Sequence, residues 1–133
     1  MALAANREVD RFVDEQLRAY PLKAGVHLFK GAFVGRDSVS GYSRPLVAGD
    51  AFEGIAYEEV DNTDGANGDK SARVDTQGDF ELPLSGAAVT DRGATGYASD
   101  DETLTLTASG NSAVGRLLQL GTSGNVVVRL SPS

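Results

Sequence analysis

The stretch Asp61–Asp69, DNTDGANGD, holds three aspartates and two asparagines, and oxygen side chains at this density are typical of calcium loops. An EF-hand loop needs oxygen ligands at positions 1, 3 and 5, a glycine at position 6 and a glutamate at position 12. Counting from Asp61 puts Ala66 at the glycine position. Counting from Asp64 puts Ala66 and Gly68, which lack side-chain oxygens, at ligand positions. The sequence therefore predicts no metal site here.

The same stretch suits a sharp connection between two strands. Aspartate and asparagine side chains accept hydrogen bonds from nearby backbone amides, and glycines such as Gly65 and Gly68 tolerate left-handed angles. Because β-prone runs flank the stretch on both sides, we predict a hairpin connection.

Residue types that support catalysis are present but do not form a known arrangement. His27 is the only histidine, and no serine lies in a G-x-S-x-G pattern. Asp79 and Glu81 would share a strand face, as a glycosidase acid pair does, but they alternate with Phe80 and Leu82 and read as a solvated face. The other carboxylate groups are Glu58 with Glu59 and the run Asp100-Asp101-Glu102. We predict no catalytic residue, no cofactor and no enzyme activity.

Charge and composition argue against further classes of function. The chain has 133 residues, no cysteine and a net charge of −7. Residues 1–44 hold seven basic and five acidic residues, and residues 45–133 hold five and fourteen, giving balances of +2 and −9. An acidic body repels phosphates, which argues against nucleic-acid binding. The uneven balance reflects either solubility or an N-terminal arm that faces a partner.

No segment is long and apolar enough to cross a bilayer, and the N-terminus lacks the apolar run of a secretory signal. We therefore expect no membrane association and a soluble protein that is made and used in a cytosol.

From residue 23 onward, short β-prone runs alternate with turn signals, as in a β-sandwich or small barrel. We predict an all-β fold, an antiparallel β-sandwich or jelly-roll-like small barrel, with one β domain over residues 23–133. The expected strands cover 25–30, 32–36, 52–60, 70–76, 79–84, 103–107, 113–120 and 126–130.

Period-2 spacing assigns residues to the core, and Pro83 cannot donate to a ladder, so its strand should lie at a sheet edge. The side chains expected in the core are Phe80, Leu82, Leu104, Leu106, Val126 and Val128.

Residues 1–22 form the predicted N-terminal arm, and Pro21 should end any element within it. A helical stripe fits its apolar residues better than a strand face does. No good helix cap precedes the stripe, however, so both conformations stay open. An apolar arm of this length cannot form a core alone, and its apolar side should be covered by its own domain, by a sister subunit or by the surface of a partner. The expected interface residues are Arg7, Val9, Arg11, Phe12, Val13, Leu17, Arg18 and Tyr20.

Several longer motifs resemble one known family. FKGAFVG lies at Phe29–Gly35, YSRPLVAGDAFEGIAYEEVDN at Tyr42–Asn62, GDKSARVDTQGDFELPL at Gly68–Leu84 and YASDDETLTLT at Tyr97–Thr107. Together with the run at Val126–Leu130, their order is similar to that of the capsid cement, or head decoration, proteins of tailed bacteriophages.

The resemblance implies a β-rich structural protein of the virion without an active site. Such proteins lie on the outer surface of the capsid, where they bridge major capsid proteins and stabilise the shell. It also implies self-association as a homo-dimer or trimer, and an extended N-terminal arm. The alternative is a carbohydrate- or host-surface-binding β module of a virion, although the chain has no tryptophan to build a sugar platform.

Overall fold

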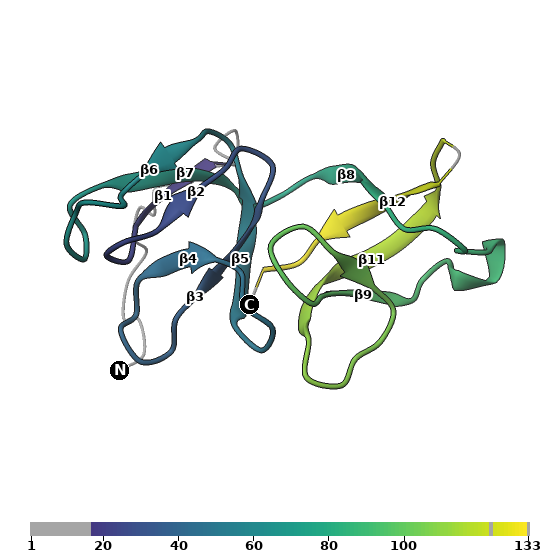
Figure 1. The fold of residues 1–133 in the computed structure, drawn as a ribbon. Helices are drawn as coiled ribbons and strands as arrows, with labels where there is room; N and C mark the ends of the chain where they lie inside the picture. The colour runs from purple at the N-terminus through teal and green to yellow at the C-terminus, as the bar shows by residue number, and fades with distance from the viewer. Residues whose placement is uncertain (1–16, 123, 133) are drawn as a thin grey trace, which may run out of the picture.

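The computed structural model describes residues 17–122 and 124–132, which form β-strands and one short 3-10 helix. The ribbon has two lobes, one built from β1–β7 and the other from β8–β12 (Figure 1). All paired strands run antiparallel, so the predicted all-β fold is confirmed.

The N-terminal sheet has the strand order β1-β7-β5-β3-β4. Leu22, directly after β1, forms a parallel bridge with Ser43 at the start of β4, so the two edges of this sheet meet. A two-stranded sheet, β2-β6, completes the lobe as a small barrel. The strands are β1 Leu17–Pro21, β2 His27–Leu28, β3 Phe33–Arg36, β4 Ser43–Pro45, β5 Ala51–Ala56, β6 Val60–Asp61 and β7 Ser71–Asp75.

The C-terminal sheet has the strand order β10-β9-β11-β12-β8. As Pro83 predicted, β8 lies at an edge of this sheet. The strands are β8 Asp79–Pro83, β9 Thr95–Ala98, β10 Leu104–Thr105, β11 Ser112–Leu120 and β12 Asn125–Leu130, with the 3-10 helix η1 at Val89–Asp91.

Two hydrophobic cores result from the alternation of side chains along β3 and β5. Phe33 and Ile55 face the C-terminal sheet, whereas their neighbours Val34 and Ala56 face the inside of the barrel. Both faces of these strands are therefore buried. The core between the sheets holds Phe33, Leu46, Phe52, Ile55, Ala98, Leu104, Val114, Leu117, Val126, Val128 and Leu130, and the barrel core holds Leu22, Leu28, Ala32, Val34, Ala56, Ala72 and Val74.

The predicted core is correct except at one residue. Leu104, Val126 and Val128 are buried, and Phe80 and Leu82 pack half-buried against the same cluster. Leu106 was expected in the core but is 38% exposed. The prediction is wrong because the strand expected over 103–107 ends at Thr105, so the alternation does not continue to Leu106.

Two other predicted elements also need correction. The strand expected over 52–60 is divided into β5 and β6, which belong to different sheets. The acidic stretch Asp61–Asp69 follows β6 and precedes β7, and these two strands do not pair. The stretch therefore connects two sheets and is not the hairpin that we expected. Strands β4 and β9 were not predicted.

The predicted arm also differs from the structure at its C-terminal end. Leu17–Pro21 form β1, which pairs with β7 in register, and the strand ends at Pro21 as expected. Of the two conformations left open for residues 17–20, the helix is therefore wrong and the strand is correct, and the β domain includes residues 17–22 in addition to the residues expected from 23 onward. The earlier part of the arm lies outside the described residues.

Candidate interaction surface

The predicted interface residues divide into two groups. Five of them, Arg7, Val9, Arg11, Phe12 and Val13, lie outside the described residues.

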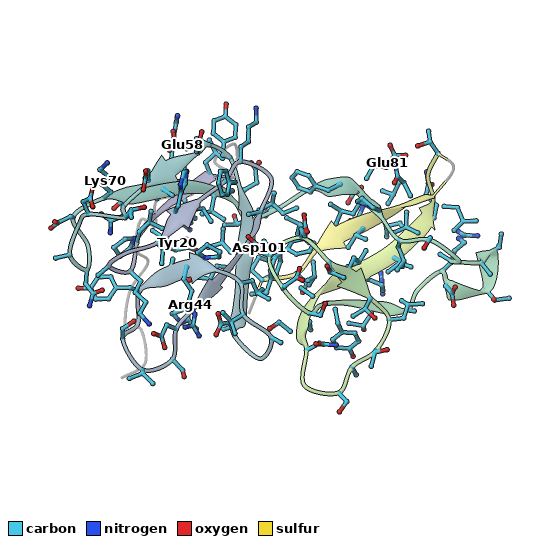
Figure 2. All side chains as sticks on the ribbon, viewed as in Figure 1. Tyr20, Arg44, Glu58, Lys70, Glu81 and Asp101 are labelled. Carbon is cyan, nitrogen blue, oxygen red and sulfur yellow. The ribbon has the colours of Figure 1, made fainter. Side chains whose placement is uncertain are left out.

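The other three predicted interface residues lie on β1. Tyr20 is half-buried and points into the N-terminal lobe, where it packs against the barrel core (Figure 2). Leu17 is half-buried, and Arg18 is exposed. The structure thus brings Leu17, Arg18 and Tyr20 onto one edge strand but assigns the Tyr20 ring to the protein's own core.

Two of the three carboxylates in the acidic stretch accept hydrogen bonds from its own backbone. Asp61 Oδ1 accepts a hydrogen bond of 2.9 Å from the Thr63 amide, and Asp69 Oδ2 accepts one of 2.9 Å from the Ala66 amide. The Lys70 ammonium donates to the Asp61 carbonyl at 2.7 Å and so brings a positive charge to the same loop. The side-chain and backbone hydrogen bonds from Thr63 are the main causes that lower the pKa of Asp61. No group of three or more potential metal ligands occurs in the described part of the chain.

Asn62 is the buried centre of this loop, with 1% of its surface exposed. Its amide nitrogen donates to the carbonyls of Lys23 at 3.0 Å and Ala66 at 3.1 Å. The other side-chain atom, Oδ1, lies against Gly65, where an added Cβ would overlap it. A glycine is therefore needed at position 65 because the Asn62 side chain approaches it closely. Of Gly65 and Gly68, only Gly68 adopts a left-handed backbone angle. Asn62 fixes the loop between the two sheets.

His27 takes part in an exposed aromatic pair. Its ring stacks on Phe29 with a centroid distance of 4.2 Å, and its Nε2 lies 2.6 Å from Glu59 Oε2. The Phe29 side chain is 56% exposed and lines a hollow of about 270 Å³ together with Asp101 and Glu102. This arrangement contains a face for stacking and carboxylates for hydrogen bonding, and none of the described residues that line the hollow carries a hydroxyl group.

The carboxylate pairs noted in the sequence belong to separate contacts. Glu58 accepts two side-chain hydrogen bonds from Arg73, of 3.1 and 3.0 Å, and these lower the pKa of Glu58. Asp79 binds a different guanidinium, that of Arg129, which lowers the pKa of Asp79. Glu81 accepts a 2.8 Å hydrogen bond from the amide of Thr122. Each of these carboxylates is thus engaged by its own neighbour.

An ion network at the ends of β4 was not predicted from the sequence. The Asp37 carboxylate accepts a hydrogen bond of 2.6 Å from the Lys23 ammonium. Arg44 donates hydrogen bonds of 3.0 and 2.8 Å to Asp50. Asp37 also accepts from the Val39 amide at 3.0 Å. The hydrogen bond from Lys23, followed by the one from the Val39 amide, holds the pKa of Asp37 well below its usual range. The turn-forming residues at positions 37–41, DSVSG, could have indicated the loop, but they do not indicate that Lys23 would bind Asp37.

These bonds fix the turn after β3, whose Val39 side chain is 94% exposed. The next turn, after β4, carries Val47 at 49% exposure and is held by a 3.1 Å bond from the Val47 amide to Asp50. Two apolar side chains are therefore presented to solvent on turns that are held by hydrogen bonds.

Searches with the sequence and the structure give no relative from which a function could be transferred: no family model, no curated protein and no solved structure matches this chain. Within residues 17–122 and 124–132, no helix is long and apolar enough to cross a membrane.

Proposed function

We propose that this chain is a capsid cement protein of a tailed bacteriophage, which binds the outside of the head and bridges major capsid proteins. The resemblance of the ordered motifs supports this role, and the all-β fold agrees with it. In this proposal the protein acts by binding, as a homo-oligomer, and not by catalysis.

The observation that carries the proposal is the way in which the N-terminal segment enters the fold. Among the strands of residues 17–122 and 124–132, β1 lies at the edge of the N-terminal sheet and pairs only with β7 along Leu17–Pro21. The residues that precede β1 in the sequence include Val9, Phe12 and Val13, and the chain joins them to this edge strand. When a neighbouring subunit or capsid protein covers the apolar side chains of such a segment, their removal from water stabilises the complex.

The exposed valines give secondary support. Val39 lies on a turn that its own hydrogen bonds already order, so little conformational entropy is lost when a partner covers it. Rigid apolar contacts of this kind suit a protein that must fit a shell of fixed shape.

The test uses purified phage heads that were assembled without this protein. Full-length protein should bind and raise the temperature at which the heads release DNA. A variant that lacks residues 1–16 should stay folded but lose binding, as should Phe12→Ala with Val13→Ala. Leu120→Ala, which shortens an exposed side chain on β11, is the matched control and should bind normally.

Two results would contradict the proposal at different points. If the full-length protein does not bind heads, the chain is not a cement protein. If the protein that lacks residues 1–16 binds as tightly as the full chain, the arm is not the docking element.

The stacked His27–Phe29 pair favours a second candidate, a carbohydrate- or host-surface-binding module. Exposed aromatic faces stack on sugar rings, and carboxylates such as Asp101 can accept hydrogen bonds from sugar hydroxyls. A glycan-binding screen with the full chain and with Phe29→Ala separates the two roles. Binding to a sugar that Phe29→Ala abolishes, without binding to heads, would support this second role.

A further inference from the structure

A row of four residues crosses the C-terminal sheet on the face away from the core. The ladder places Asp79 of β8 opposite Arg129 of β12, Arg129 opposite Arg116 of β11, and Arg116 opposite Thr95 of β9. All four are exposed. Two arginines are thus direct cross-strand neighbours, an arrangement that is unfavourable unless anions compensate it.

Only one anion in the row compensates the two guanidinium groups. Asp79 binds Arg129 through hydrogen bonds of 2.9 and 3.2 Å. Within the described residues, the guanidinium of Arg116 has no hydrogen bond and no ion pair. One positive charge is therefore left uncompensated in a chain whose net charge is −7.

A hollow of about 360 Å³ opens beside these two arginines. Its walls include the hydroxyl residues Thr95 and Ser131, and its small residues are Ala113 and Gly115. The register between β11 and β9 shifts between Ala113 and Gly115, and a Cβ on Gly115 would overlap the Arg129 carbonyl oxygen. Gly115 therefore lets β11 approach β12 closely, and the hollow lies next to a guanidinium for which the described residues supply no anion.

We propose that this hollow is a carboxylate-binding site in which Arg116 holds the ligand. A guanidinium has parallel N–H donors that match the two oxygens of a carboxylate, as the neighbouring Arg129–Asp79 pair illustrates. A single uncompensated charge matches a monoanion, and the acidic surroundings oppose a multiply charged phosphate. The Thr95 and Ser131 hydroxyls supply further donors. The inference rests on this geometry alone and is independent of the proposed capsid role.

The carboxylate can come from a small molecule or from a glutamate side chain of a polypeptide. A titration followed by two-dimensional NMR of the full-length protein distinguishes them. The probes are sodium acetate and a short glutamate-containing peptide, with the glutamine version of the peptide and sodium chloride at equal ionic strength as controls. The signals to follow are the backbone amides of Gly115 and Ser131.

We expect saturable shifts of these signals with acetate and with the glutamate peptide, and none with the glutamine peptide or with chloride. Tighter binding of the peptide than of acetate would assign the site to a polypeptide, and equal or weaker binding would assign it to a small molecule. Arg116→Gln should abolish the shifts, and Arg116→Lys should weaken them. Lys30→Gln removes the same charge from another exposed position and should leave the shifts unchanged.

Three results would overturn the proposal. The first is an equal response to acetate and chloride, which would mean screening alone. The second is a response to acetate that persists in Arg116→Gln. The third is tighter binding of inorganic phosphate than of acetate at equal ionic strength, which would contradict the assignment to a monoanion.

Discussion

Gly65 and Asn62 are in such close contact that a methyl group on Gly65 would overlap the Asn62 Oδ1 atom. Gly65→Ala should therefore displace Asn62 from its hydrogen bonds with Lys23 and Ala66. We expect a loss of about 1–3 kcal/mol in the free energy of unfolding, which urea denaturation measures.

The matched control is the same substitution in an Asn62→Ala background. That background removes the overlapped atom, so Gly65→Ala should then cost less than about 0.5 kcal/mol. Equal costs in the two backgrounds would show that the contact does not determine the residue at position 65.

The acidic loop should not need a metal ion, because its Asp61 and Asp69 carboxylates already accept hydrogen bonds from the loop's own backbone. We expect the same melting temperature with calcium and with a chelator. Asp64→Asn combined with Asp69→Asn should change stability by less than about 0.5 kcal/mol, as surface substitutions usually do. A rise of several degrees on addition of calcium would refute this prediction.

Leu104 and Leu106 offer a comparison of the same substitution at two nearby positions. Leu104 is 5% exposed, whereas Leu106 is 38% exposed. Leu104→Ala should destabilise the protein by about 2–5 kcal/mol, because it leaves a cavity between the sheets. Leu106→Ala should cost less than about 1 kcal/mol. Similar losses in thermal or urea unfolding would place both side chains in one core.

Asp37 should make the protein sensitive to acid. The folded state holds the pKa of Asp37 below its unfolded value of about 3.9, since Lys23 and the Val39 amide bind the charged form. The resulting stability is present above about pH 5 and is lost as the pH falls through 4 toward the folded pKa.

Asp37→Asn tests this pH dependence. The variant should be less stable than the wild-type chain at pH 7, because the Lys23 ion pair is lost. Its free energy of unfolding should fall less steeply between about pH 5 and pH 2 than that of the wild type. Parallel curves for the two proteins would mean that other carboxylates cause the acid sensitivity.

Two truncations test where the fold begins. Deletion of residues 1–16 keeps β1 and should leave the melting temperature nearly unchanged. Deletion of residues 1–21 removes β1 and the Tyr20 ring, exposes the edge of β7 and should destabilise the barrel. Circular dichroism during heating measures both, and equal melting temperatures for the two truncations would show that β1 is dispensable.

The sequence predicted the strands that carry clear local signals. β12 is rich in β-branched residues, and β8 alternates around a proline, so both their conformation and the edge position of β8 were predictable. β4 and β10, which have three and two residues, are too short to show a period and depend on their partners. The limits of the strand around Leu106 were therefore not predictable.

Pairing between distant strands was also not predictable. The turn composition of Asp61–Asp69 is the same whether the flanking strands pair with each other or with others. β6 pairs with β2 and β7 pairs with β1, so the loop crosses between sheets. Likewise, the Arg116–Arg129 neighbours follow from the register of β11 with β12, which no local pattern contains.

The division of the two sheets along the chain has a consequence for synthesis on the ribosome. Every strand of the N-terminal sheet lies within residues 17–75, and every strand of the C-terminal sheet lies within residues 79–130. The barrel can therefore close while the second half of the chain is still being translated. Until β11 and β12 emerge, Phe33 and Phe52 have no covering sheet. The nascent chain thus passes through a stage with an exposed aromatic surface, at which pauses in translation or chaperone contact would influence the yield of folded protein.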